Sequence, residues 1–234
     1  MIPKIIHYCW FGGKEKSRLA KKCIESWKRF CPDYEIREWN EENFDVNSYK
    51  FTEQAYEAGK YAFVSDVARL YAVYTCGGFY FDTDVELIRC PDQLRNEPAF
   101  MGMEKSLYVA TGLGFGAQAK NEIIGGNLRE YEKMSFINDD GSYNFAGCPR
   151  VTTRFLESYG LVRENVYQRL PELTVFPSEY FDPFDSTTGI MKKTKNTYSV
   201  HWYNQSFLSV GTRIRSRFAR PFHRLFGKRK GGDA

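Results

Sequence analysis

The spacing of apolar residues in the first forty positions predicts a strand, a helix and a second strand. Runs rich in β-branched and aromatic residues predict strands over residues 4–10 and 34–39. Between them, Ser17 is a candidate N-cap, and apolar residues recur at helical spacing until Pro32 stops the helix. This opening is typical of a parallel sheet that is covered by helices.

The rest of the chain continues the alternation with shorter strands. Helices are expected over residues 48–58, 61–75, 121–134 and 150–159, and strands over residues 79–81, 100–103, 108–116, 173–176 and 197–202. No internal repeat or low-complexity linker interrupts the pattern. The sequence therefore predicts the α/β class, with a mixed, mostly parallel sheet flanked by helices.

The most informative segment is residues 65–86, which read SDVARLYAVYTCGGFYFDTDVE. A helix ends at two glycines, an aromatic strand follows, and Asp82 and Asp84 come directly after it. Carboxylates at i and i+2 can both turn toward one hard cation, and α/β proteins hold ligands at the carboxyl ends of their strands. We interpret the pair as a metal-diphosphate site. The alternative is that both aspartates form turns that cap the next element.

The segments SDVARLY and GGFYFDTD resemble the signature of glycosyltransferases related to yeast initiating mannosyltransferases, bacterial capsule transferases and clostridial glucosylating toxins. The segment IPKIIHYCWFGG at residues 2–13 is similar to the first strand of that family, and HWYNQSF at residues 201–207 is similar to its closing metal-binding segment. The resemblance implies a nucleotide-sugar transferase fold of the GT-A type over residues 1–206, followed by a tail over residues 207–234.

The resemblance also implies a metal site and its catalytic residues. Asp84 is the implied direct ligand, and Asp82 contacts the donor ribose and either the metal-bound water or the metal itself. His201 is the implied third ligand, although a histidine that is hydrogen-bonded at a strand end is an alternative. The expected ion is Mn²⁺ or Mg²⁺, and the imidazole slightly favours Mn²⁺. Such an ion stabilises a departing diphosphate.

A second set of residues is implied to bind the sugar of the donor. Asp66 and Arg69 correspond to family residues that hold hydroxyls of the donor sugar, and the fork of Arg69 is also suited to a phosphate oxygen. The alternative is an ion pair on the surface of a helix. Tyr80 is expected either in the core or as a wall of the donor pocket.

The remaining implied contacts lie at the two ends of the match. Trp10 is implied to stack near the nucleotide base, with a core tryptophan as the alternative. Asn204 and Ser206 are implied phosphate or metal contacts. The segment 147–149, Gly-Cys-Pro, is similar to a Gly-Pro turn near the acceptor groove of relatives, and its central cysteine departs from their pattern.

The composition supports one domain. The chain has 234 residues, of which 42% are hydrophobic, enough for one well-packed core. Its six cysteines contain no Cys-x-x-Cys pair and are expected to be reduced, mostly buried thiols. The sequence shows neither a run of 18 apolar residues nor the pattern of a signal peptide, which predicts a cytoplasmic location.

The charge is concentrated at one end. The formal net charge is +4, but residues 213–234 hold eight Lys and Arg and one acid, so residues 1–212 carry a net charge of −3. Apolar residues at helical spacing within residues 207–230 predict a basic amphipathic helix that suits an anionic membrane surface, here the inner face of the plasma membrane. The alternative is a helix packed on the domain. Nucleic acid is not an expected partner, because no reading motif accompanies the charges.

Together, the residues and the resemblance predict a metal-dependent, retaining glycosyltransferase of polysaccharide biosynthesis. The expected donor is a nucleoside-diphosphate sugar, with a UDP-sugar first, and the group transferred is a hexose or N-acetylhexosamine. The expected acceptor is a glycan or a lipid-linked oligosaccharide. Two alternatives stay open: a metal-dependent phosphohydrolase of nucleotide sugars, and a non-catalytic module that binds glycans or membranes.

Overall fold

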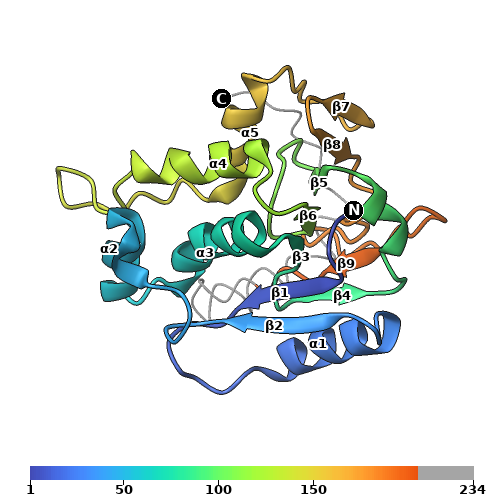
Figure 1. Cartoon of the computed structure of the whole chain (residues 1–234), viewed down its shortest axis with the longest axis horizontal. Helices are drawn as coiled ribbons and strands as arrows, with labels where there is room; N and C mark the ends of the chain where they lie inside the picture. The colour runs from blue at the N-terminus through green and yellow to red at the C-terminus, as the bar shows by residue number, and fades with distance from the viewer. Residues whose placement is uncertain (205–234) are drawn as a thin grey trace.

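The computed structural model describes residues 1–204, in which nine strands form two sheets (Figure 1). The larger sheet has the order β2-β1-β3-β6-β5-β8-β7, and the smaller one pairs β4 with β9. The strands are β1 (Ile5–Cys9), β2 (Glu35–Trp39), β3 (Gly78–Tyr80), β4 (Val85–Leu87), β5 (Ala99–Gly102), β6 (Phe115–Ala117), β7 (Gln168–Leu170), β8 (Leu173–Phe176) and β9 (Ser199–His201).

The large sheet is mixed. Strands β1, β2, β3, β5 and β8 run in one direction, whereas β6 and β7 run in the other. The ends of β1 and β3 therefore lie at the same edge of the sheet. Because β6 is antiparallel to β3, the residues that precede β6 reach that edge too. The end of β1, the end of β3 and the residues before β6, which are distant in sequence, therefore meet at this edge of the sheet.

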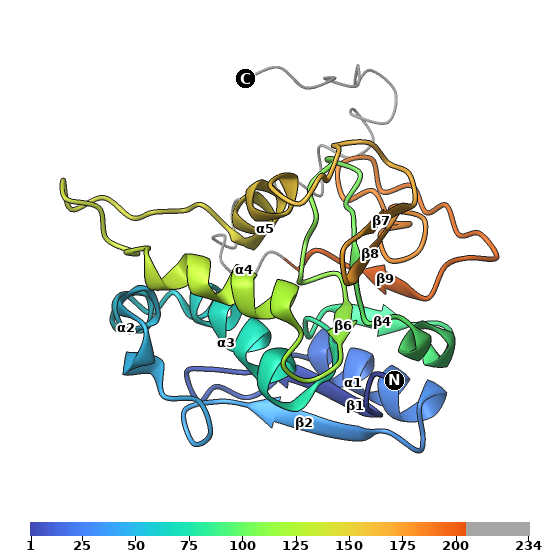
Figure 2. The ribbon, with the colours of Figure 1, turned by 45° about the horizontal axis from the view of Figure 1, so that its top comes forward.

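Helices cover both faces of the large sheet (Figure 2). They are α1 (Arg18–Phe30), α2 (Lys50–Glu57), α3 (Tyr61–Cys76), α4 (Glu122–Glu132) and α5 (Cys148–Glu157), with short 3₁₀ helices η1 (Val46–Ser48) and η2 (Asp92–Asn96). One apolar core lies between α1 and the sheet and includes Trp27, Phe79 and Phe100. The other lies under α2, α3 and α4 and includes Phe51 and Tyr80.

Local signals in the sequence explain the boundaries of two helices. Ser17 caps α1 as predicted, because its hydroxyl accepts a hydrogen bond from the backbone N–H of Ala20 at 3.1 Å. Helix α3 ends at Gly77 and Gly78, whose φ angles are +66° and +107°. A Cβ at Gly78 would lie 2.7 Å from the carbonyl oxygen of Ile5, so the two glycines also permit the close approach of β3 to β1.

The predicted α/β architecture with a mixed sheet and flanking helices is confirmed, but two of the predicted strands are wrong in extent. Residues 108–116 contain an isolated bridge at Val109 and turns, and only the end of this stretch enters β6. Residues 197–202 contribute only β9, and this strand pairs with β4 rather than with the large sheet. In both places the backbone leaves the strand to approach the carboxyl end of β3.

Several predictions fall outside the described residues. Ser206 and the tail over residues 207–234 lie there, as does the membrane surface predicted for residues 207–230. Within residues 1–204, no helix is both long and apolar enough to cross a membrane.

Candidate functional site

The candidate site forms where β3 ends and the small sheet begins. The chain leaves β3 at Tyr80 and reaches Asp82 and Asp84 just before β4. Strand β9 pairs with β4 in the antiparallel sense and sets His201 opposite Val85. As a result, one potential ligand atom from each of Asp82, Asp84 and His201 lies within 4.8 Å of the other two.

Asp84 is held from three sides by the segment around β9. Its Oδ1 lies 3.1 Å from Nε2 of His201, and its Oδ2 accepts a hydrogen bond from the backbone N–H of Asn204 at 2.7 Å. Its carbonyl oxygen accepts another from the backbone N–H of Trp202 at 3.0 Å. Burial works to raise the pKa of Asp84, but the charge and hydrogen bond of His201 outweigh it, so the pKa is lowered.

His201 responds to the same contact in the opposite sense. Burial works to lower its pKa, yet the charge of Asp84 and the hydrogen bond to it raise the pKa to about 9. The imidazole is therefore protonated at neutral pH when it pairs with Asp84. Only the neutral imidazole ligates a metal, so a cation bound here would take the place of this proton.

The three side chains fit a divalent cation. Two carboxylates and one imidazole are ligand types that suit Mn²⁺. Among residues 1–204, the buried Nδ1 of His201 has no hydrogen-bond partner, and such an orphaned polar atom is consistent with a site that takes a ligand. The grouping brings together all three residues predicted as metal ligands.

Asp82 lies between the small sheet and the buried guanidinium of Arg69. Its Oδ1 accepts a hydrogen bond from the hydroxyl of Tyr80 at 2.9 Å and lies 3.2 Å from Nη2 of Arg69. Burial raises the pKa of Asp82, against the attraction of Arg69. A Cβ at Gly112 would lie 2.3 Å from Oδ2 of Asp82, so only glycine at position 112 leaves this carboxylate room.

Arg69 is not part of a surface ion pair. Its side chain is buried, and its Nη2 lies 3.1 Å from Oδ1 of Asp66 as well as 3.2 Å from Asp82. Its Nη1 is 3.4 Å from the hydroxyl of Thr111 and 3.2 Å from Sγ of Cys148. A buried guanidinium with two carboxylates fixes their relative position, which excludes the surface alternative for Arg69.

Asp66 lies one turn before Arg69 on α3 and meets the start of α5. The backbone N–H of Cys148 donates to Oδ2 of Asp66 at 3.2 Å. Burial raises the pKa of Asp66 to about 6, despite the nearby charge of Arg69. The Gly-Cys-Pro segment at residues 147–149, predicted as a turn, is the start of α5 and touches the acid predicted to hold the donor sugar.

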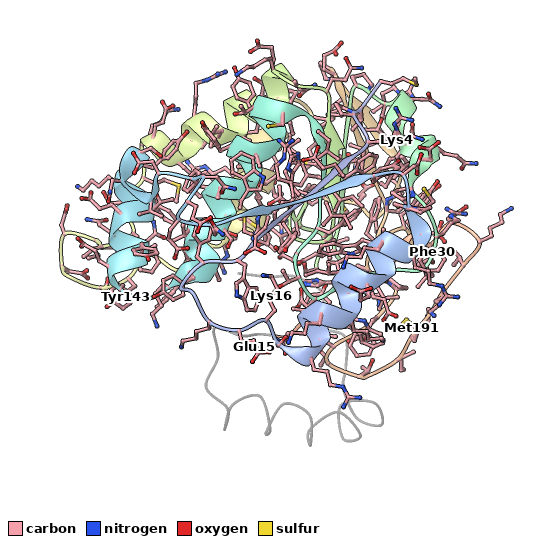
Figure 3. The ribbon with its side chains drawn as sticks, turned by 60° about the horizontal axis from the view of Figure 1, so that its bottom comes forward. Lys4, Glu15, Lys16, Phe30, Tyr143 and Met191 are labelled. Atoms are coloured by element: carbon pink, nitrogen blue, oxygen red, sulfur yellow. The ribbon has the colours of Figure 1, made fainter. Side chains whose placement is uncertain are left out.

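Trp10 and Tyr80 differ in burial: Trp10 lies in a half-exposed loop, whereas Tyr80 lies in the core. Trp10 is half-buried in the loop after β1, where its indole N–H donates to the carbonyl of Lys14 at 2.6 Å. The ammonium group of Lys16, which is labelled in Figure 3, lies 5.8 Å from the centre of the Trp10 ring. Tyr80 is 1% exposed and belongs to the core, as one of its two alternatives predicts, and its hydroxyl donates a hydrogen bond to Asp82.

Two residues near His201, Tyr203 and Asp182, are not among the site residues predicted from the sequence. The ring of Tyr203 lies 4.0 Å from the ring of His201, centre to centre. Asp182 is buried, accepts a hydrogen bond from the backbone N–H of Lys105 at 3.1 Å, and has its pKa raised to about 6 by burial. Tyr203 lies two positions after a predicted ligand, and this spacing could have identified it as a site residue. No feature of the sequence identifies Asp182, because only tertiary packing brings it close to His201.

Part of the chain is similar in sequence to known glycosyltransferases. Residues 17–101 match the model of the glycosyltransferase sugar-binding region containing a DXD motif. The chain is also 33% identical over 107 residues to inositol phosphoceramide mannosyltransferase 3 of Schizosaccharomyces pombe (strain 972 / ATCC 24843). That match covers 43% of this chain and 29% of the relative, so the chain spans less than a third of the relative's length.

Two solved structures have a similar fold. One is the PaToxG glycosyltransferase, with a TM-score of 0.52 and 21% identity over 67% of this chain and 69% of that one. The other is a glycosyltransferase involved in the glycosylation of the major capsid of PBCV-1, with a TM-score of 0.53 and 12% identity over 92% of this chain and 100% of that one. At these identities the likeness is one of fold, and the fold is the GT-A type.

Proposed function

We propose that the whole chain is a cation-dependent glycosyltransferase, because residues 17–101 match the family model of glycosyltransferase sugar-binding regions that contain a DXD motif. The proposed donor is a nucleoside-diphosphate sugar, with UDP as the expected nucleotide. The proposed transferred group is a hexose or N-acetylhexosamine, and the acceptor is a glycan or a lipid-linked oligosaccharide.

One observation carries this proposal. The cluster of Asp82, Asp84 and His201 lies directly beside the buried Arg69, which is itself paired with Asp82. A site that combines potential ligands for a cation with a fixed guanidinium suits a diphosphate on one side and sugar hydroxyls on the other. Neither a turn nor a simple core requires three ionisable groups to converge in this way.

Each of the chain's own residues has a distinct proposed part. Asp84, His201 and Asp82 would hold Mn²⁺ or Mg²⁺. When bound, such an ion offsets the negative charge that develops on a departing diphosphate. Asp66 is positioned by the N–H of Cys148 to accept hydrogen bonds from sugar hydroxyls. We assign the base to the loop that holds Trp10 and the phosphates to the segment after β9 that holds Asn204.

We propose that the sugar is transferred with retention of its anomeric configuration. In this step the bond from the anomeric carbon to the phosphate oxygen breaks as the acceptor oxygen bonds to the same carbon on the same face. The acceptor proton passes to an oxygen of the departing phosphate. Of the four acids described at the site, Asp66, Asp82 and Asp84 are each paired with a cationic side chain, which favours this route over attack by one of those three carboxylates.

A thermal-shift panel tests the donor and the ion together. The full chain is melted with UDP-, GDP- and CMP-sugars, each with and without MnCl₂. We expect one nucleotide sugar to raise the melting temperature only when Mn²⁺ is present, because a ligand that binds the folded state stabilises it. If no nucleotide sugar stabilises the protein in either condition, the proposed function is wrong. Release of free sugar at a rate that no acceptor increases would favour the phosphohydrolase instead.

The location of the protein is a separate proposal that rests on sequence alone. We propose that it works in the cytoplasm and reaches the inner face of the plasma membrane through residues 207–230, which supply its basic charge. Flotation with phosphatidylglycerol vesicles tests this. Replacing Arg213, Arg215 and Arg217 by Glu is expected to abolish flotation, and unchanged flotation would contradict the proposal.

A further inference from the structure

Residues 134–147 connect α4 to α5 through a hairpin that projects beyond α2 (Figures 1 and 2). Its two arms meet at an antiparallel bridge between Ile137 and Tyr143. Its base is fixed to α2, because Oε1 of Gln54 accepts hydrogen bonds from the backbone N–H groups of Phe136 at 2.9 Å and Ile137 at 3.0 Å. The hairpin is therefore tied to the domain at a defined place.

Four aromatic rings, here called the aromatic platform, pack together at this hairpin: Phe63, Phe136, Tyr143 and Phe145. Phe136 is fully buried, lies 5.0 Å from Phe63 and stacks on Tyr143 at 5.1 Å with an angle of 22°. Phe145 closes the group at 5.8 Å from Phe63 and 5.9 Å from Tyr143. Nevertheless, Phe145 is 62% exposed and Tyr143 is 40% exposed. A buried ring thus supports two exposed ones.

The platform lies beside the proposed donor pocket. Helix α3 makes two contacts where the hairpin joins α5: Phe63 meets the ring of Phe145, and Asp66 accepts a hydrogen bond from the N–H of Cys148, the first residue of α5, at 3.2 Å. Phe63 and Asp66 are three residues apart on α3, and one helical turn rises about 5 Å. Phe63, the ring that Phe145 contacts, therefore lies about one helical turn from the acid that we assign to the donor sugar.

We propose that the exposed rings of Phe145 and Tyr143 bind a pyranose ring of the acceptor glycan. A pyranose has an apolar face of C–H bonds, which a rigid aromatic ring can cover at little cost in side-chain entropy. Large exposed aromatic groups in a soluble domain commonly mark a binding surface. The inference rests on the proposed function, because it assigns the second substrate of the same reaction.

The charges around the platform favour a sugar over a lipid bilayer. The tip of the hairpin carries two adjacent exposed acids, Asp139 and Asp140, which an anionic bilayer would repel. The ammonium group of Lys60 lies 5.8 Å from the centre of the ring of Tyr143, which is labelled in Figure 3. Acidic and basic groups around an aromatic face suit the hydroxyls of a sugar, whereas a bilayer favours an apolar rim with basic charges.

An oligosaccharide array tests the proposal with the full chain in MnCl₂ and UDP. The proteins compared are wild type, Phe145→Ala, Phe145→Tyr and Tyr143→Ala. The matched control is Tyr167→Ala, an aromatic residue that is 48% exposed and packs on Phe176 at the other end of the molecule. We expect wild type to bind a subset of glycans and both alanine variants of the platform to lose about tenfold in affinity for that subset. Phe145→Tyr and Tyr167→Ala should bind as wild type does.

Any other result would overturn the proposal that the aromatic platform binds a sugar. Equal glycan binding by wild type and Phe145→Ala would show that the rings are not used, as would a wild type that binds no glycan. Loss of flotation by Phe145→Ala on phosphatidylcholine vesicles would assign the rings to a bilayer instead. The donor is measured separately by the Mn²⁺-dependent thermal shift with the nucleotide sugar, which Phe145→Ala should leave unchanged. If wild type shows no Mn²⁺-dependent thermal shift, the proposed function itself is contradicted, and not only the proposal for the aromatic platform.

Discussion

The buried guanidinium of Arg69 pairs with Asp82, with 3.2 Å between Nη2 and Oδ1, and this ion pair joins helix α3 to the end of strand β3. Gly77 and Gly78 lie between the two elements and turn the chain back so that the pair can form. Because Arg69 also pairs with Asp66, one guanidinium positions two of the acids that we assign to the donor. The pair therefore links the stability of the fold to the geometry of the site.

The first prediction concerns this guanidinium. Replacing Arg69 by Met removes the cation from the buried Asp66 and from the partly buried Asp82, and breaking a buried pair such as Arg69–Asp66 costs about 3–5 kcal/mol in the free energy of unfolding. Urea unfolding followed by circular dichroism measures the change. Arg129→Met is the control, because Arg129 is exposed and lies 3.9 Å from Glu122 on the surface. An equal effect of the two substitutions would contradict the buried role of Arg69.

The second prediction separates two neighbouring acids. Asp84→Asn is expected to abolish the stabilisation by MnCl₂, because an amide is a much weaker ligand than a carboxylate and no longer attracts the cation. Glu86 lies two positions later in the same segment, but its carboxylate pairs with Lys22 at 2.7 Å and stands outside the cluster. Glu86→Gln should therefore keep the Mn²⁺-dependent shift of the melting temperature. Loss of the shift in both variants, or in neither, would refute the assignment of the ligands.

The third prediction concerns the space around Asp82. Gly112→Ala would place a Cβ 2.3 Å from Oδ2 of Asp82, so the carboxylate must move. A displacement on the order of 1 Å at a catalytic group can lower kcat/KM about a hundredfold, and we expect a loss of that size in transfer. Gly147→Ala is the control, because its Cβ would meet only an ordinary contact at 3.6 Å. Initial rates of the two variants with the donor from the thermal-shift panel measure the difference. Similar rates for both would show that Asp82 tolerates the shift.

The sequence revealed the acids of the site because they follow a local rule. Asp82 and Asp84 come directly after an aromatic strand, and the two glycines that end the preceding helix can be recognised from the sequence without the structure. His201 was predicted for a different reason, which is the resemblance of residues 201–207 to the closing segment of the family. Their convergence required in addition the pairing of β4 with β9, which no periodicity in the sequence announces.

The residues that the sequence did not reveal come from segments without regular structure. Thr111 and Gly112 belong to the stretch predicted as a strand, yet Asp82 and Phe81 approach so closely that the backbone turns there instead. A Cβ at Gly114 would lie 2.6 Å from Cε1 of Phe81, which shows how tight the approach is. Tertiary contact thus overrides local β-propensity at this site. Asp182 likewise enters the site from a loop whose path is set by packing.

The fourth prediction concerns pH and a buried histidine away from the site. His7 on β1 is fully buried, with Nε2 2.7 Å from the carbonyl oxygen of Gly77 and Nδ1 accepting from the indole N–H of Trp39 at 3.0 Å. Burial lowers its pKa from 6.5 to about 4. Between these values the unfolded chain binds a proton that the folded protein does not, so the free energy of unfolding falls as the pH falls from 6.5 toward 4.

The His7→Gln variant isolates this effect. A glutamine amide can donate to the Gly77 carbonyl and accept from Trp39, but it does not titrate. Asp66 and Asp182, whose pKa values are raised to about 6, titrate with the opposite sign, and they are present in both proteins, so they cancel in the comparison. A shift of this size corresponds to about 3 kcal/mol when it is complete. We expect urea unfolding at pH 8, 6 and 5 to show a steeper acid loss in wild type than in the variant. Parallel curves would mean that His7 takes up its proton in the folded protein as readily as in the unfolded chain, and so that its burial between Gly77 and Trp39 does not exclude the charge.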